Sequence, residues 1–251
     1  MVCNNASTAA VNFTGTGTSY TWTNNETSIG LAASGTGNIA AFTATNSGVS
    51  PVTATITVTP HYTNNSVTCD GPTQTFTITV NPTPTLTSTL TPAAICDNST
   101  FHYTPTSATT GTTFAWSRAA VAGISNAAAS GTGNPGESLH NTTASPVNVT
   151  YVYTLSANGC TNPTTYSVVV TVKPTATLTS SITPPAICDN AVFSYTPTSA
   201  TTGTTFAWSR AAVAGISNIA ATGSGNPNES LRNTTAAPVN VTYVYTLSAN
   251  G

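Results

Sequence analysis

The sequence predicts an all-β protein, and three compositional observations support this prediction. Thr accounts for 56 of the 251 residues and, with Val, Tyr and Phe, favours extended strands. Gly, Pro and Asn recur along the chain and are typical of turns. The strong helix formers Glu, Lys, Gln and Met are nearly absent, which argues against a helical bundle.

Internal repetition is the clearest feature of the sequence. Residues 82–159 align with residues 174–251 at a shift of 92, and 65 of the 78 positions are identical. A more distant copy precedes them, since Ala32–Asn38 has the same sequence as Ala128–Asn134. A period of this length is too long for a solenoid turn and fits a small domain.

Proline-containing junctions at Asn81–Pro84 and Lys173–Pro174 predict three domains with stiff linkers between them. The first domain covers residues 1–81 and lacks the opening strand. The second covers residues 82–173 and is complete, and the third covers residues 174–251 and lacks the last strand. Because both ends are out of phase with the repeat, we expect the chain to be a piece of a longer linear array.

Within the second repeat, short apolar and β-branched segments alternate with turn residues. Val147–Leu155 and Tyr166–Val172 alternate cleanly, and the turn cluster Asn158–Pro163 between them predicts a hairpin. The other expected strands are Thr85–Leu90, Thr100–Thr104, Thr113–Ser117, a weak one near Ile124, and Glu137–Asn141. About seven short strands in this order predict an immunoglobulin-like β-sandwich.

Equivalent side chains in the repeats indicate structural roles. Trp22, Trp116 and Trp208 occupy one repeat position, and we expect them in the cores, with a binding role as the alternative. Arg118 and Glu137 recur together as Arg210 and Glu229, which predicts an ion pair on each sandwich. Asp97 is expected to accept backbone N–H hydrogen bonds in its turn.

The five cysteines follow the repeat as well. Cys3 and Cys69 are 66 residues apart and Cys96 and Cys160 are 64 apart, which predicts one disulfide within each complete repeat. Cys188 would then be unpaired, because its partner would fall at position 252. Disulfides indicate an oxidising compartment outside the cytoplasm. Buried free thiols in a cytosolic protein are the alternative.

Composition and motifs exclude several classes of function. Only ten residues are charged and the net charge is −2, which is unsuited to binding nucleic acid. No apolar stretch is long enough for a membrane span. Neither a zinc-ligand spacing nor a calcium-binding set of carboxylates is present, and no set of nucleophile, base and orienting residue is visible. We therefore expect no metal, no cofactor and no enzymatic activity.

Four segments of the second repeat resemble a known family of domains. Ile95–Asn98, Thr113–Ser117, Pro146–Tyr151 and Val172–Thr175 resemble the PKD-like repeats of very large Bacteroidetes surface proteins, which include type IX-secreted gliding adhesins. The acidic turn that follows the Trp in classical PKD domains is absent after Trp116 and Trp22. The resemblance implies a secreted or cell-surface location and a role in cell adhesion.

Three functional hypotheses remain open from the sequence. The first is an extracellular structural module that forms the stalk of a bacterial surface adhesin, with neighbouring repeats as its partners. The second is a subunit of a self-assembling extracellular filament, since low charge and β-rich edges favour edge-to-edge pairing. The third is a carbohydrate-binding module that contacts surface glycans, which a repeated row of exposed aromatic side chains would favour.

Overall fold

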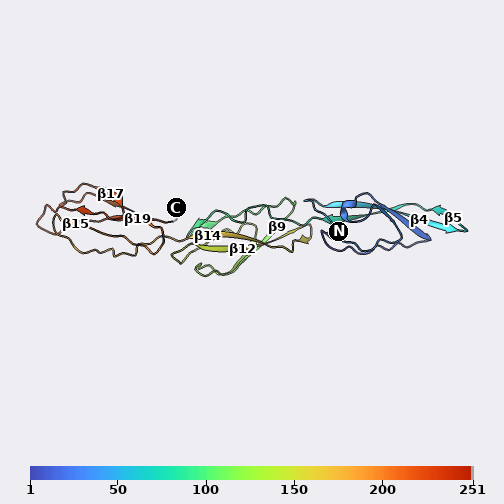
Figure 1. Ribbon diagram of the computed structural model, residues 1–251, viewed down its shortest axis with the longest axis horizontal. Coiled ribbons are helices and arrows are strands. Elements are labelled where there is room, and N and C mark those ends of the chain that lie inside the picture. The colour runs from blue at the N-terminus through green and yellow to red at the C-terminus, as the bar shows by residue number, and fades with distance from the viewer. Residues whose placement is uncertain (250–251) are drawn as a thin grey trace.

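The computed structural model describes residues 1–249, and these residues form short and long β-strands with one helical segment (Figure 1). That segment is the 3-10 turn η1 at Thr27–Ile29. The strands form three sheet systems in chain order. Figure 1 shows the first at the blue end of the long axis, the second in the middle and the third at the red end. We call residues 1–81, 82–173 and 174–249 the first, second and third unit; these boundaries stay predictions.

The first unit contains one six-stranded sheet. Its path runs β1-β6-β4-β2-β3, and β5 pairs with the far part of β4. The strand bounds are β1 Val2–Cys3, β2 Ser19–Asn24, β3 Ser34–Thr36, β4 Val52–Asn64, β5 Val67–Asp70 and β6 Gln74–Asn81. Alternate residues of β4 are buried, as expected for a strand with one face on a core.

The second unit repeats this sheet and adds a small opposing layer. The path runs β10-β9-β12-β14-β7, with β13 on β12, and β8 pairs with β11. The bounds are β7 Ile95–Cys96, β8 Thr100–Phe101, β9 Thr113–Arg118, β10 Ala129–Thr132, β11 Glu137–Ser138, β12 Val147–Ala157, β13 Cys160–Thr161 and β14 Tyr166–Lys173. Phe101 and Leu139, from the β8–β11 side, pack with Val149 and Tyr151 of β12 in one buried cluster, so the unit is sandwich-like.

The third unit contains a smaller sheet. Its path is β17-β16-β19, and β15 pairs with β18. The bounds are β15 Val192–Phe193, β16 Thr205–Arg210, β17 Ala221–Ser224, β18 Glu229–Ser230 and β19 Val244–Ser248. Among the residues up to 249, no strand pairs with the edge of β19 that corresponds to the β14 side of β12.

Several expected strands are shorter than the sequence indicated. Thr85–Leu90 forms no regular strand; isolated backbone bonds such as Thr87 N to Thr106 O at 2.8 Å replace a continuous ladder. Ile124 makes only an isolated bridge with Asn141. Prolines 82, 84 and 92 lack the N–H groups that a ladder requires, which explains the irregular backbone around the first of these segments.

Candidate functional site: the joint between the first and second units

A disulfide joins the first unit to the second. Cys3 ends β1, which lies parallel to the end of β6 with Cys3 opposite Asn81. Cys160 begins β13 at the tip of the β12–β13 hairpin, directly after the tight turn Asn158–Gly159, whose two residues both have left-handed φ values of 53° and 79°. The two cysteines form an S–S bond with their Cα atoms 5.6 Å apart.

This bond corrects the predicted pairing of Cys3 with Cys69 and of Cys96 with Cys160. Cys3 lies near the end of the sheet where Val80 pairs with Val52, whereas Cys69 lies opposite Tyr62 on the same strand β4. Ten residues of β4 separate these positions, about 33 Å in an extended strand. A disulfide requires Cα atoms about 5.5 Å apart. Cysteines at opposite ends of one sheet therefore cannot bond to each other, but cysteines at facing ends of successive units can.

The second unit has the same internal geometry. Ile95 and Val147 both lie opposite Val172, whereas Cys160 lies opposite Ala157, ten residues further along β12. Cys96 therefore lies at the far end of its sheet from Cys160 and is a free, exposed thiol. Cys69 and Cys188 are free and exposed as well.

Hydrogen bonds support the disulfide at this joint. The Asn81 side-chain amide donates to the Asn158 carbonyl at 2.7 Å and so ties the end of β6 to the hairpin turn. The Asn162 side-chain amide donates to the Pro84 carbonyl at 2.9 Å in a buried contact. Pro82 and Pro84 are themselves buried. The linker is therefore packed into the joint.

The opening turn of each unit also binds the segment that leaves the unit. Asn4 donates from its side-chain amide to Thr83 Oγ1 at 3.3 Å, and Thr175 Oγ1 donates to Asp97 Oδ2 at 2.8 Å. The Asn141 backbone N–H donates to Asp97 Oδ1 at 2.8 Å, as the sequence predicted for this turn. Burial raises the pKa of Asp97, but the hydrogen bonds from Thr175, His140 and Asn141 outweigh it and hold the pKa below its usual value.

The predicted ion pairs are present in both the second and third units. Arg118 donates from Nε and a terminal nitrogen to the two oxygens of Glu137, each at 2.8 Å, and Arg210 binds Glu229 in the same way at 2.9 Å. Arg118 is 2% exposed, and its second terminal nitrogen and the Ala127 carbonyl complete its environment. The hydrogen bonds from Arg118 lower the pKa of Glu137.

The buried tyrosine of β12 completes this network. Tyr151 Oη donates to Glu137 Oε2 at 2.7 Å, and burial together with that carboxylate raises the Tyr151 pKa. Tyr243 makes the same bond to Glu229 at 2.6 Å. In the first unit the position two residues after the Trp is Asn24, whose side-chain amide donates to the carbonyls of Leu31 and Ala32. The pair is therefore a structural feature of the second and third units.

Each of the three tryptophans lies in a core. Trp22, Trp116 and Trp208 are each 7% exposed. The indole of Trp116 packs on Gly131, where an added Cβ would lie 2.8 Å from Cζ2, so this position needs glycine. Gly35 and Gly223 make the same approach to Trp22 and Trp208. These contacts explain why the tryptophans and the Gly-Thr-Gly or Gly-Ser-Gly segments recur together.

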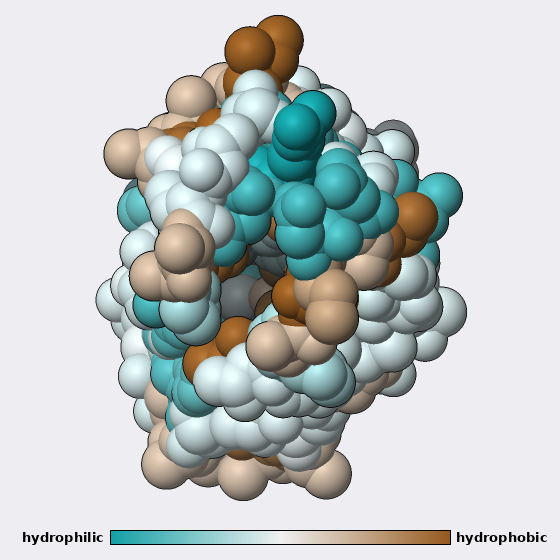
Figure 2. Space-filling view, turned by 90° about the vertical axis from the view of Figure 1, so that its left-hand side faces the viewer, coloured by the Kyte–Doolittle hydropathy of each residue, from teal (hydrophilic) through white to brown (hydrophobic). Residues whose placement is uncertain are grey.

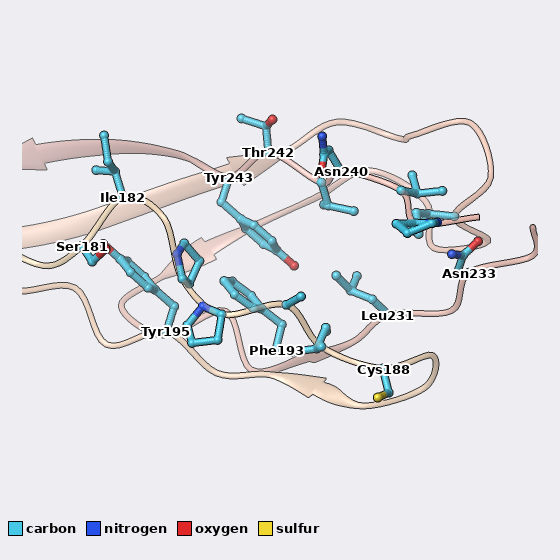
Figure 3. Close-up of a pocket in the computed structure, with 18 of the residues that line it drawn as sticks. Ser181, Ile182, Cys188, Phe193, Tyr195, Leu231, Asn233, Asn240, Thr242 and Tyr243 are labelled. Atoms are coloured by element: carbon cyan, nitrogen blue, oxygen red, sulfur yellow. The ribbon is translucent and has the colours of Figure 1, made fainter. Parts of the chain in front are cut away.

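The third unit has an open groove of about 640 Å³ where the second unit has a filled core. Phe193, Tyr195, Val241 and Tyr243 line it, and Figure 3 shows the rings of Phe193, Tyr195 and Tyr243 turned toward its interior. In the second unit, β14 pairs with β12 at seven consecutive positions and buries Val168, Val170 and Val172. Tyr151 and Tyr153 are 0% exposed there, whereas the equivalent Tyr243 and Tyr245 are partly exposed.

Other features of a functional site were sought in residues 1–249. These residues contain no group of three or more His, Cys, Asp and Glu that could hold a metal ion. None of their helical segments has the length and apolar character of a membrane span. Tyr62 is the one largely exposed aromatic side chain in this part of the chain, so the row of exposed aromatics that would favour carbohydrate binding is not observed.

Comparison with known proteins identifies one domain. A PKD-like domain is found at residues 93–176, a range that contains all strands of the second unit from β7 to β14. No curated protein matches the chain.

Proposed function

We propose that this chain is an extracellular structural module: a tandem linear array of immunoglobulin-like units that forms part of the stalk of a large bacterial surface adhesin. The PKD-like domain at residues 93–176 supports it, because PKD-like domains are immunoglobulin-like modules that are typically extracellular and non-catalytic. The resemblance of the repeats to Bacteroidetes adhesins supplies the adhesin context.

The observation that carries the proposal is the Cys3–Cys160 disulfide. It crosses from one sheet system to the next, and disulfides persist in oxidising compartments. Flexible linkers let neighbouring domains turn freely, whereas a covalent bond beside a buried proline linker restrains both bending and twisting. A stalk needs that restraint, because its function is to hold a distal part of the protein away from the cell.

Location and shape can be tested on the intact protein. We expect antibodies against this chain to label intact cells of the source organism, and protease treatment of those cells to remove the signal. Small-angle scattering of the purified chain should give a rod, and reduction of the disulfide should broaden the distribution of distances without unfolding the units. Labelling that requires cell lysis, or an unchanged scattering profile after reduction, would contradict the proposal.

The open groove of the third unit favours a second candidate function, a subunit of a self-assembling filament. An unpaired edge of β19 beside an apolar groove is the arrangement in which an added strand gains main-chain hydrogen bonds and buried side chains together. In the second unit β14 fills the corresponding space. A strand of that character supplied by another molecule would join the two molecules non-covalently.

We expect a synthetic peptide with the sequence of residues 164–174 to bind the chain and to raise the melting temperature of the third unit. The physical reason is that Val168, Val170 and Val172 of that sequence are fully buried in the second unit. Fluorescence anisotropy of the labelled peptide measures binding. A control peptide with V170D should bind at least tenfold more weakly, and equal binding of the two peptides would rule out insertion of the strand into the groove.

A further inference from the structure

The five cysteines fall into two structural classes. The opening class lies where each unit begins, and the hairpin class lies at the far end of the sheet, opposite the end of the long central strand. The first class comprises Cys3, Cys96 and Cys188, and the second comprises Cys69 and Cys160. The Cys3–Cys160 bond joins one member of each class.

Backbone geometry defines the opening class. Cys3 and Cys96 each pair in parallel with the last residue of the unit's final strand. In all three units the carbonyl of the opening cysteine accepts the N–H of the residue three positions later, at 3.0 Å, and the intervening Asn has a left-handed φ. These residues are Ala6 and Asn5, Ser99 and Asn98, and Ala191 and Asn190. The Cys188 turn therefore has the local conformation of the bonded Cys3 turn.

The hairpin class differs in burial between its two members. Cys160 lies opposite Ala157, and both are 3% exposed because the first unit covers them. Cys69 lies opposite Tyr62 at the same place in the first unit, and both are exposed. Tyr62 is 54% exposed and Val67 in the same hairpin is 65% exposed. The hairpin surface that is buried at the joint has an uncovered, apolar counterpart on β4 and β5.

We propose that the β4–β5 hairpin of one copy of this chain docks on the Cys188 end of a second copy, and that Cys69 and Cys188 form a disulfide between the two copies. The new contact repeats the Cys3–Cys160 joint between molecules. It is head-to-tail, since different surfaces of the two copies meet, and such contacts continue into open chains of molecules. The inference rests on the proposed role as a structural array and extends that array beyond one polypeptide.

The positions of the two cysteines fit this contact. Figure 1 shows β5 at one extreme of the long axis and β15, which follows Cys188 closely, toward the other. Figure 2 looks onto the latter end and shows a hollow bordered in part by hydrophobic residues. In Figure 3, Cys188 lies on the rim of the groove with its sulfur turned away from Tyr243. The apolar hairpin residues Tyr62 and Val67 can therefore meet an apolar surface while the two sulfurs approach from outside.

Cys96 belongs to the opening class but has a different neighbour. The Thr175 hydroxyl binds Asp97 beside it, as Thr83 binds Asn4 beside Cys3, and the chain continues from Thr175 into the third unit. The space next to Cys96 therefore belongs to the third unit of the same molecule, as the space next to Cys3 belongs to the second. A hairpin from another copy would meet the third unit there, which leaves Cys188 as the opening cysteine accessible to it.

The bond forms by oxidation with a low-molecular-weight disulfide such as oxidised glutathione. The Cys69 thiolate attacks one sulfur of the oxidant, so that a mixed disulfide forms and one glutathione thiolate leaves. The Cys188 thiolate then attacks the Cys69 sulfur of the mixed disulfide and expels the second glutathione thiolate. Both cysteine thiols lose their protons, and the two electrons end on two molecules of reduced glutathione.

The test uses the full chain with the Cys3–Cys160 bond intact, incubated in a glutathione redox buffer and analysed on non-reducing gels. We expect a ladder of dimers, trimers and longer species that collapses to monomer on reduction. C69S and C188S should each abolish the ladder, and an equimolar mixture of the two variants should give one new band at twice the monomer mass. Peptide mapping of that band should identify the Cys69–Cys188 bond.

C96S is the matched control, because it removes an exposed thiol of the same class and should leave the ladder unchanged. A ladder that survives C188S, or a chain that stays monomeric while Cys3 and Cys160 are bonded, would overturn the inference. Either result would leave the proposed stalk intact, since that proposal rests on the bond within the chain. Failure of Cys3 and Cys160 to bond would instead contradict the stalk.

Discussion

When the oxidised chain is pulled from its two termini, we expect its fully extended length to be about 550 Å shorter than that of the reduced chain. The disulfide spans 157 residues, and an extended chain covers about 3.5 Å per residue. Force applied at Met1 passes through Cys3 directly to Cys160, so residues 4–159 carry no load. Single-molecule force spectroscopy with handles at both ends measures this difference as contour length.

Variants distinguish this bond from the pairing within units. C160S in an oxidised chain should release the full ~550 Å, whereas a Cys96–Cys160 bond of 64 residues would release only about 220 Å. C96S serves as the control and should release nothing. A release near 220 Å with C160S would show that the cysteines pair within the second unit. The expected result would mean that the first unit and most of the second stay folded under loads that extend the third.

The strands that could be predicted from the sequence are those in which alternation and composition agree. Val147–Leu155 and Tyr166–Val172 were expected as a hairpin, and they form β12 and β14 within two residues of the expected ends. Thr85–Leu90 has a strand-like composition but forms no regular strand. Composition records the preference of a residue for an extended backbone, but not whether a neighbouring strand offers a ladder.

The cysteines show a different limit of sequence reasoning. Spacing within the repeat identified two equivalent positions, but it could not tell whether they meet within one unit or between two. The deciding information is that strand β4 carries the chain about 33 Å from one position to the other. The hairpin prediction contained a usable signal: Cys160 directly follows the Asn-Gly turn, so it had to lie at the tip of the hairpin, far from the opening of its own unit.

The buried pair was predictable because it recurs, whereas its surroundings were not. Arg118 and Glu137 are 19 residues apart and reappear unchanged in the third unit, which indicated an ion pair. The hydroxyl of Tyr151 and the Ala127 carbonyl depend on the packing of β12 against β9, and no spacing in the sequence points to them. The same packing turns an expected surface contact into a nearly buried one.

We expect E137A to lower the free energy of unfolding of the second unit by about 3 kcal/mol, among the largest effects available from a single substitution away from the disulfide. Removing one partner of a buried ion pair leaves an uncompensated charge, which costs about 3–5 kcal/mol. The lower end applies because the Glu137 side chain is 17% exposed, so water reaches the site in part. Arg118, at 1%, would be left with two backbone carbonyls and the Tyr151 hydroxyl.

Hydrogen exchange resolved by peptide measures this effect in the intact chain. Peptides from β9 and β12 should exchange faster in E137A, while peptides from the first unit, where Asn24 takes the place of the arginine, should be unchanged. Acid provides a second measure of the same pair. The folded-state pKa of Glu137 is lowered, so its stabilisation is present above the unfolded-state value near 4.5 and is lost as the pH falls through the folded value. Exchange in the second unit should therefore accelerate in acid for the wild-type chain and change much less for E137A. Equal acid sensitivity of the two chains would show that the pair does not stabilise the second unit.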